Sequence, residues 1–185
     1  SFCEAHDLWI CSDEIHCDLM LSDAPHIPML SLGERAAART ITFLSPSKTY
    51  NLPGLACAYA VIPNPEIRRA FQKVCRGLVT EVNCFGYAGL VAAYTHGEPW
   101  RREMIEVLKQ NLNLLVSVLG DRHPEVGIPR MDATYLAWLD LRAYGISSPH
   151  AFMESHGIGL SNGVDFGAPT GFLRLNFGCP TSTLE

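Results

Sequence analysis

Three short apolar runs, each stopped by polar residues or proline, constrain the fold of this chain more than any other feature. They cover residues 8–11, 40–44 and 56–62. Runs of this length that are apolar throughout are typical of strands buried on both faces of a parallel sheet. A short segment with helical character, residues 33–36, lies between the first two runs. Strand, helix and strand in this order predict an α/β fold.

Longer helical patterns follow these runs. Residues 65–76 place apolar side chains on one side at helical spacing. Residues 84–94 are rich in alanine and glycine, which predicts a closely packed helix. From residue 100 to about 119, apolar residues recur every three or four positions, which predicts one long helix. These residues are Met104, Leu108, Leu112, Leu115 and Leu119.

Strands and a helix alternate again in the last third of the chain. We expect strands at residues 134–139, 158–160 and 172–177 and a helix at 148–156. The predicted organisation is therefore an α/β domain with a mostly parallel sheet over residues 1–98. The long helix and a small α+β domain follow over residues 99–185.

Composition excludes several classes of function. The chain has 185 residues and a net charge of −5, whereas a nucleic-acid surface needs clustered cations. No apolar stretch reaches the roughly 18–20 residues of a membrane helix, so we expect no membrane partner. Seven cysteines without a C-x-x-C pair indicate reduced thiols and a cytoplasmic protein. Cys11, His16 and Cys17 match no common zinc spacing, so no metal site is predicted.

Residues with useful chemistry follow the first two apolar runs. Asp13 and His16 come after one run, and Ser45 and Lys48 come after the next. Because ligands collect at the carboxyl ends of strands in open α/β sheets, these side chains are candidates for one pocket. Arg174 stands alone on an apolar strand. Each has an ordinary alternative: a carboxylate that caps a turn, a solvated lysine, or the polar face of a strand.

Four segments in a fixed order carry a specific resemblance. They read SDEIHCD, SPSKTYNLPGL, ATYLAWLD and LRLNFGCP, at residues 12–18, 45–55, 133–140 and 173–180. The chain resembles the fold-type I pyridoxal-phosphate enzymes of the class I/II aminotransferase superfamily, and most closely the cystathionine β-lyase, or C–S lyase, branch. The resemblance runs from about Trp9 to the last residue. It covers the carboxyl-terminal half of such enzymes, so we expect a piece of a longer protein whose final helix is cut after Glu185.

The resemblance implies a role for each candidate. Lys48 would form a Schiff base with pyridoxal 5′-phosphate and, once the substrate amine displaces it, remove the Cα proton. Asp13 would keep the ring nitrogen protonated, His16 would stand near the 3′-oxygen, and Ser45 would bind the phosphate. Arg174 would hold the α-carboxylate of a small amino-acid substrate, because a planar two-pronged donor suits a carboxylate better than lysine does.

One departure from the aminotransferase pattern separates two activities. Many aminotransferases carry an arginine for the phosphate where this chain has Ala56, and the lyase branch commonly lacks it. We therefore expect a pyridoxal-phosphate C–S β-lyase that cleaves cystathionine or cysteine S-conjugates to a thiol, pyruvate and ammonia. The alternatives are an aminotransferase and an incomplete, non-catalytic fragment. The family also implies a homodimer.

Overall fold

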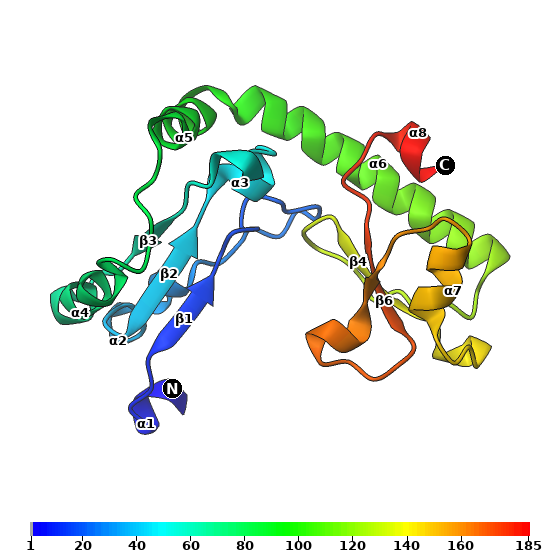
Figure 1. The fold of residues 1–185 in the computed structure, drawn as a ribbon, viewed down its shortest axis with the longest axis horizontal. Helices are drawn as coiled ribbons and strands as arrows, with labels where there is room; N and C mark the ends of the chain where they lie inside the picture. The colour runs from blue at the N-terminus through cyan, green and yellow to red at the C-terminus, as the bar shows by residue number, and fades with distance from the viewer. Residues whose placement is uncertain (1) are drawn as a thin grey trace. The chain divides into compact units, whose positions relative to one another are not determined.

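Two units make up the described part of the chain. The computed structural model describes residues 2–185. Residues 2–19 and 24–102 form the first unit, and Met20–Asp23 with Glu103–Glu185 form the second (Figure 1). Each unit contains one three-stranded sheet. The predicted α/β class is therefore confirmed.

The sheet of the first unit has the order β1-β2-β3. Strand β1 (Ile10–Asp13) pairs parallel with β2 (Thr40–Leu44), and β3 (Tyr59–Val61) pairs antiparallel with β2. The long connection from β1 to β2 gives the chain room to cross over and start in the same direction, whereas the shorter loop to β3 reverses it. The three predicted strands are present, and the described sheet is mixed.

Five α-helices of the described chain lie wholly within the first unit. Helix α4 packs against it through Phe71, whose ring lies 5.9 Å from that of Phe43. Asn64 caps α4 and Asn83 caps α5, each by accepting hydrogen bonds from backbone N–H groups of the first turn. The helices are α1 (Phe2–Ala5), α2 (Glu34–Ala37), α3 (Pro46–Thr49), α4 (Pro65–Cys75) and α5 (Cys84–His96).

Helix α6 (Glu98–Arg122) is the predicted long helix, and it passes from the first unit into the second. Its buried face differs from the predicted one. The buried residues are Ile105, Leu108, Asn111 and Leu115. The apolar repeat alone placed Met104 and Leu119 on this face, but both are only partly buried. The polar residue Asn111 joins this face because its side chain forms hydrogen bonds with the segment that follows β6.

The sheet of the second unit is antiparallel and has the order β4-β6-β5. The strands are β4 (Leu136–Asp140), β5 (Ser161–Asn162) and β6 (Phe172–Asn176), and the helices are α7 (Pro149–Ser155) and α8 (Thr181–Leu184). The strand predicted at 158–160 is wrong. The pairing of β5 begins at Ser161, opposite Arg174, so the apolar residues before it belong to the connection from α7.

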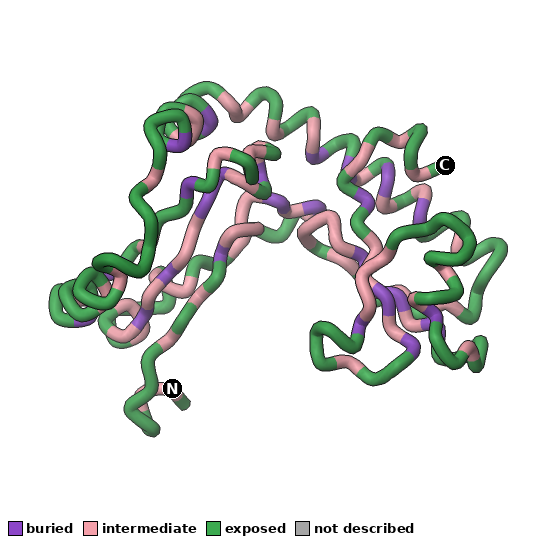
Figure 2. The backbone as a smooth tube through the Cα atoms, in the orientation of Figure 1, coloured by how far each residue is buried: buried purple, intermediate pink, exposed green. Residues whose placement is uncertain are grey.

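Buried residues concentrate along the strands and on one side of α6 (Figure 2). Leu19 in the first unit, and Ala137, Leu173 and Phe177 in the second, have no exposed surface. No helix among the described residues is both long enough and apolar enough to cross a membrane.

Candidate functional site

The carboxyl ends of β1 and β2 bring together four of the five predicted site residues. Asp13 is the last residue of β1 and lies opposite Phe43 in the parallel register. Ser45 lies two residues after Phe43, directly behind the end of β2. It is the N-cap of α3, the helix that contains Lys48. His16 lies in the turn that follows Asp13. Parallel pairing therefore places these side chains at one edge of the sheet.

Ser45 fixes the shape of the loop after β2. It is the N-cap of α3, where its Oγ accepts a hydrogen bond from Ser47 N at 3.1 Å. Pro46 occupies the first helical position, which needs no N–H donor. Ser45 Oγ also donates to Cys57 O at 2.7 Å and lies 2.9 Å from Ser47 Oγ. The buried hydroxyl is thus fully engaged by its own chain.

Lys48 and Asp13 are both exposed. Within residues 2–185, no hydrogen bond or ion pair engages the Lys48 ammonium. The Asp13 carboxylate accepts a single hydrogen bond, from Ile15 N at 3.2 Å. The site therefore presents one amine and one carboxylate that are largely free to bind a ligand.

The turn that carries His16 is held by backbone hydrogen bonds. Cys17 N donates to Glu14 O and Leu19 N donates to His16 O, each at 3.0 Å. Burial raises the pKa of the Cys17 thiol to about 11, with the charges of Asp18 and Glu14 acting in the same direction. This thiol therefore stays protonated and is a poor nucleophile. No group of metal-binding side chains forms in the described chain.

Aromatic rings that were not predicted from the sequence pack beside the lysine helix. Tyr50, two residues after Lys48, lies 5.8 Å from the Tyr94 ring and 6.3 Å from the Trp100 ring. A Cβ on Gly97 would overlap the Tyr50 ring, which explains the glycine between α5 and α6. The rings come from three separate segments, so no local pattern in the sequence indicates that they meet.

Arg174 lies on the central strand of the second unit. Its neighbours across the sheet are Trp138 and Ser161. Arg174 Nη2 donates to Ser161 Oγ at 3.4 Å, and the guanidinium carbon lies 4.1 Å from the centre of the Phe166 ring. Among the residues that the structure describes, no carboxylate pairs with this guanidinium. That Arg174 meets Lys48 around one ligand stays a prediction.

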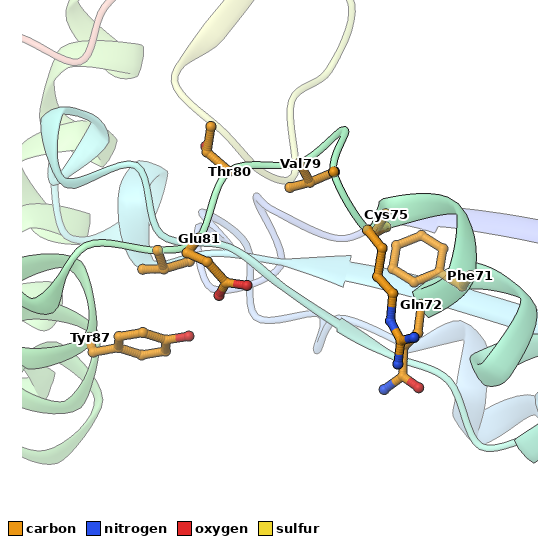
Figure 3. Close-up of a pocket in the computed structure, with 10 residues that line it drawn as sticks. Phe71, Gln72, Cys75, Val79, Thr80, Glu81 and Tyr87 are labelled. Atoms are coloured by element: carbon orange, nitrogen blue, oxygen red, sulfur yellow. The ribbon is translucent and has the colours of Figure 1, made fainter.

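A pocket of about 520 Å³ lies elsewhere in the first unit (Figure 3). It is bordered by the end of α4, the following loop and the first turn of α5, and its lining includes Phe71, Arg76, Glu81 and Tyr87. None of the predicted site residues lines it. The pocket is therefore separate from the candidate site.

Comparisons with known proteins agree with the motif resemblance. Cystathionine beta-lyase PatB of Bacillus subtilis (strain 168) is 36% identical over 188 residues, which cover 99% of this chain and 49% of PatB. The crystal structure of OvoB matches with a TM-score of 0.95 and 42% identity over 99% of this chain and 48% of that one. Cystalysin from Treponema denticola, whose crystal structure contains pyridoxal 5′-phosphate, matches with a TM-score of 0.89 and 33% identity over 96% of this chain and 46% of that one.

The chain spans about half the length of the curated relatives it matches. A model of the family described as aminotransferase class I and II matches residues 1–185. The motifs around Asp13, Lys48 and Arg174 and the close structural matches point the same way. The chain belongs to the class I and II aminotransferase family.

Proposed function

We propose that the protein containing this chain is a pyridoxal 5′-phosphate-dependent C–S β-lyase. Its substrates would be cystathionine or cysteine S-conjugates, and its products a thiol, pyruvate and ammonia. The observation that carries the proposal is the free Lys48 ammonium at the same sheet edge as the Asp13 carboxylate. Similarity to PatB supports this activity over others of the family.

The donor set at this edge fits the cofactor. Lys48 would carry the covalent link to the cofactor aldehyde, and Asp13 would face the ring nitrogen, whose protonated form a carboxylate stabilises. His16 would lie near the 3′-oxygen. Ser45 would bind the phosphate, but its hydroxyl proton must first leave Cys57 O. When bound, the cofactor supplies an electron sink for charge that develops at Cα.

Arg174 is suited to hold the substrate. Its guanidinium is oriented by the Phe166 ring and by Ser161, yet it lacks an acidic partner in the described chain. A substrate α-carboxylate would complete this arrangement with two parallel hydrogen bonds. These two hydrogen bonds would fix the direction of the Cα–H bond, and Lys48 Nζ would then accept the Cα proton.

An aminotransferase is the second candidate, since the family as a whole carries that name. Ala56 favours the lyase, because the position where many aminotransferases have a phosphate-binding arginine holds a short apolar side chain. Ala56 also has a left-handed backbone, with φ of 48°. A long side chain on this left-handed backbone would leave the loop in a different direction from one on a backbone with negative φ.

Two further properties are part of the proposal. We propose a cytoplasmic location, supported by seven cysteines that are all free thiols. We also propose a homodimer, in line with the family. Analytical ultracentrifugation of the protein tests the second property directly.

The test of the activity uses cystathionine without any keto-acid acceptor. A lyase releases pyruvate and a free thiol in equal amounts, whereas an aminotransferase releases no thiol and only exchanges the amino group of cystathionine with a keto-acid acceptor once one is added. Borohydride treatment in the presence of the cofactor should fix a pyridoxyl group on the peptide that contains Lys48, as mass spectrometry will detect.

Lys48→Ala should abolish both results. Lys73→Ala is the matched control, because Lys73 is an exposed lysine on α4, away from the sheet edge. Labelling of Lys73 in place of Lys48 would refute the proposal.

A further inference from the structure

The residue that follows Asp13 is a buried carboxylate with three hydrogen bonds. Glu14 is 7% exposed. Ser12 Oγ and Met29 N each donate to Glu14 Oε1 at 2.9 Å, and His26 Nε2 lies 2.9 Å from Oε2. Burial by itself would raise the pKa of Glu14, but the hydrogen bonds with His26, Met29 and Ser12 lower it below its usual value. Glu14 is therefore held in its charged form.

Asp13 and Glu14 lie on opposite faces of the sheet, because successive residues in extended chain alternate. The backbone ladder reaches Glu14, whose N–H donates to Phe43 O at 3.0 Å. Ser12 shares the face of Glu14, as their hydrogen bond requires. Thr42, opposite Ser12 in the register, is buried on this face too. The sheet face opposite to that of Asp13 is thus polar, and hydrogen bonds connect it to residues 26–29.

Few interactions orient the Asp13 side chain. Among the described residues, its carboxylate accepts a hydrogen bond only from Ile15 N, within its own turn, so its direction follows the backbone of residues 13–15. The Glu14 side chain is bound to residues 26–29, a distant segment of the chain. Its carbonyl also accepts from Cys17 N, which begins the turn that carries His16.

We propose that Glu14 is a positioning residue for Asp13. By fastening the carboxyl end of β1 to residues 26–29 from the opposite face, it fixes the direction in which the Asp13 carboxylate meets a bound ring. This inference rests on the proposed function, in which Asp13 holds the ring nitrogen. Glu14 itself does not touch the cofactor.

A double-mutant cycle tests the inference by measuring the dissociation constant of pyridoxal 5′-phosphate. The four proteins are the wild type, Asp13→Asn, Glu14→Ala and the double variant. Each single substitution should weaken binding about tenfold, the lower end of what loss of an orienting partner causes at metal sites. Because Glu14 acts through Asp13, the double variant should bind no more weakly than Asp13→Asn alone. Multiplied effects would overturn the inference.

A spectroscopic measurement separates positioning from simple stabilisation. In Glu14→Ala, the pH dependence of the visible absorption of the bound cofactor should change in the same direction as in Asp13→Asn. A Glu14 that only stabilised the fold would lower the midpoint of unfolding and leave this spectrum unchanged, which would refute the inference.

His26→Ala covers the case in which Glu14→Ala does not fold. The His26 side chain is 32% exposed, and its removal takes away one of the three hydrogen bonds of Glu14. Binding should weaken about threefold with Asp13 present and not at all in the Asp13→Asn background. Equal effects in both backgrounds would contradict the inference. His96→Ala, an exposed histidine at the end of α5, is the control and should bind as the wild type does.

The failure of this inference differs from the failure of the proposed function. If Asp13→Asn binds the cofactor as tightly as the wild type, the role of Asp13 is wrong and the inference fails with it. If Asp13→Asn weakens binding but Glu14→Ala does not, only the inference fails.

Discussion

Asn111 offers the sharpest test of how the second unit is held together. It has no exposed surface, although it is a polar residue within the apolar repeat of α6. Its Nδ2 donates to Phe177 O at 3.0 Å and to Cys179 O at 2.8 Å, and its Oδ1 accepts from Thr181 Oγ1 at 2.8 Å. One side chain therefore joins α6 to the chain that leaves β6.

We expect Asn111→Ala to lower the free energy of unfolding by about 1–3 kcal/mol. A buried group left without its partner costs about 1–3 kcal/mol. The Phe177 carbonyl belongs to a fully buried residue and bears most of this cost, whereas Cys179 and Thr181 are partly exposed and can turn to water. Asn111→Asp should be worse than alanine at neutral pH, because a charged carboxylate would face two carbonyl oxygens.

Urea unfolding followed by circular dichroism measures these changes. Asn113→Ala is the matched control, because Asn113 is exposed on the same helix and alanine is the better helix former. It should leave stability unchanged or raise it by about 0.5 kcal/mol. If Asn111→Ala costs no more than Asn113→Ala, the three hydrogen bonds do not hold α6 to β6.

Three further substitutions test separate features. Thr42→Val should raise the free energy of unfolding by about 1 kcal/mol in a urea titration, since it removes a buried hydroxyl that lacks a partner among the described residues; a loss would show that the hydroxyl is satisfied. Ala56→Gly should stabilise the protein by about 0.5–1 kcal/mol in the same assay by relieving the left-handed backbone, and no gain would mean that the strain is absent. Hydrogen bonds from Arg101 and Arg102 lower the pKa of Glu98 from 4.5 to about 2, so this pairing stabilises the fold above pH 4.5 and is lost as the pH falls toward 2. Glu98→Gln should therefore lessen the acid-dependent fall in thermal midpoint, and an unchanged acid profile would contradict the pairing.

Local sequence patterns predicted most of the helices and strands, and the register between paired strands determined the residues at which the strands begin. The strand at 40–44 has the predicted bounds because its apolar, β-branched residues are bounded by Arg39 and Ser45. The first strand begins at Ile10 and not at Leu8, because the register with β2 begins at Ile10 opposite Thr40. Leu8 and Trp9 are apolar but exposed, and composition alone cannot distinguish them from strand residues.

In the candidate site, too, some features follow from local sequence patterns and others depend on the tertiary fold. The motifs predicted roles for Asp13, Ser45, Lys48 and Arg174, and these roles stay predictions. The alternation of strands and helices predicts that the first three lie at strand ends, whereas Arg174 lies within β6. Apart from the bond between Ser12 and Glu14, the hydrogen bonds of Glu14 and Asn111 were not predictable, because the partners lie 12–70 residues away along the chain. Such contacts depend on the tertiary fold and leave no periodic signal.

The hydrogen bond from Ser45 Oγ to Cys57 O joins two points 12 residues apart. This bond closes residues 46–56 into a ring, and the loss of conformational entropy on closing the ring occurs when the chain folds. Because Ser45 would bind the phosphate only after its hydroxyl leaves Cys57 O, cofactor binding would open this ring. Deuterium uptake by the backbone of residues 46–56 should accordingly be slow before any cofactor is added.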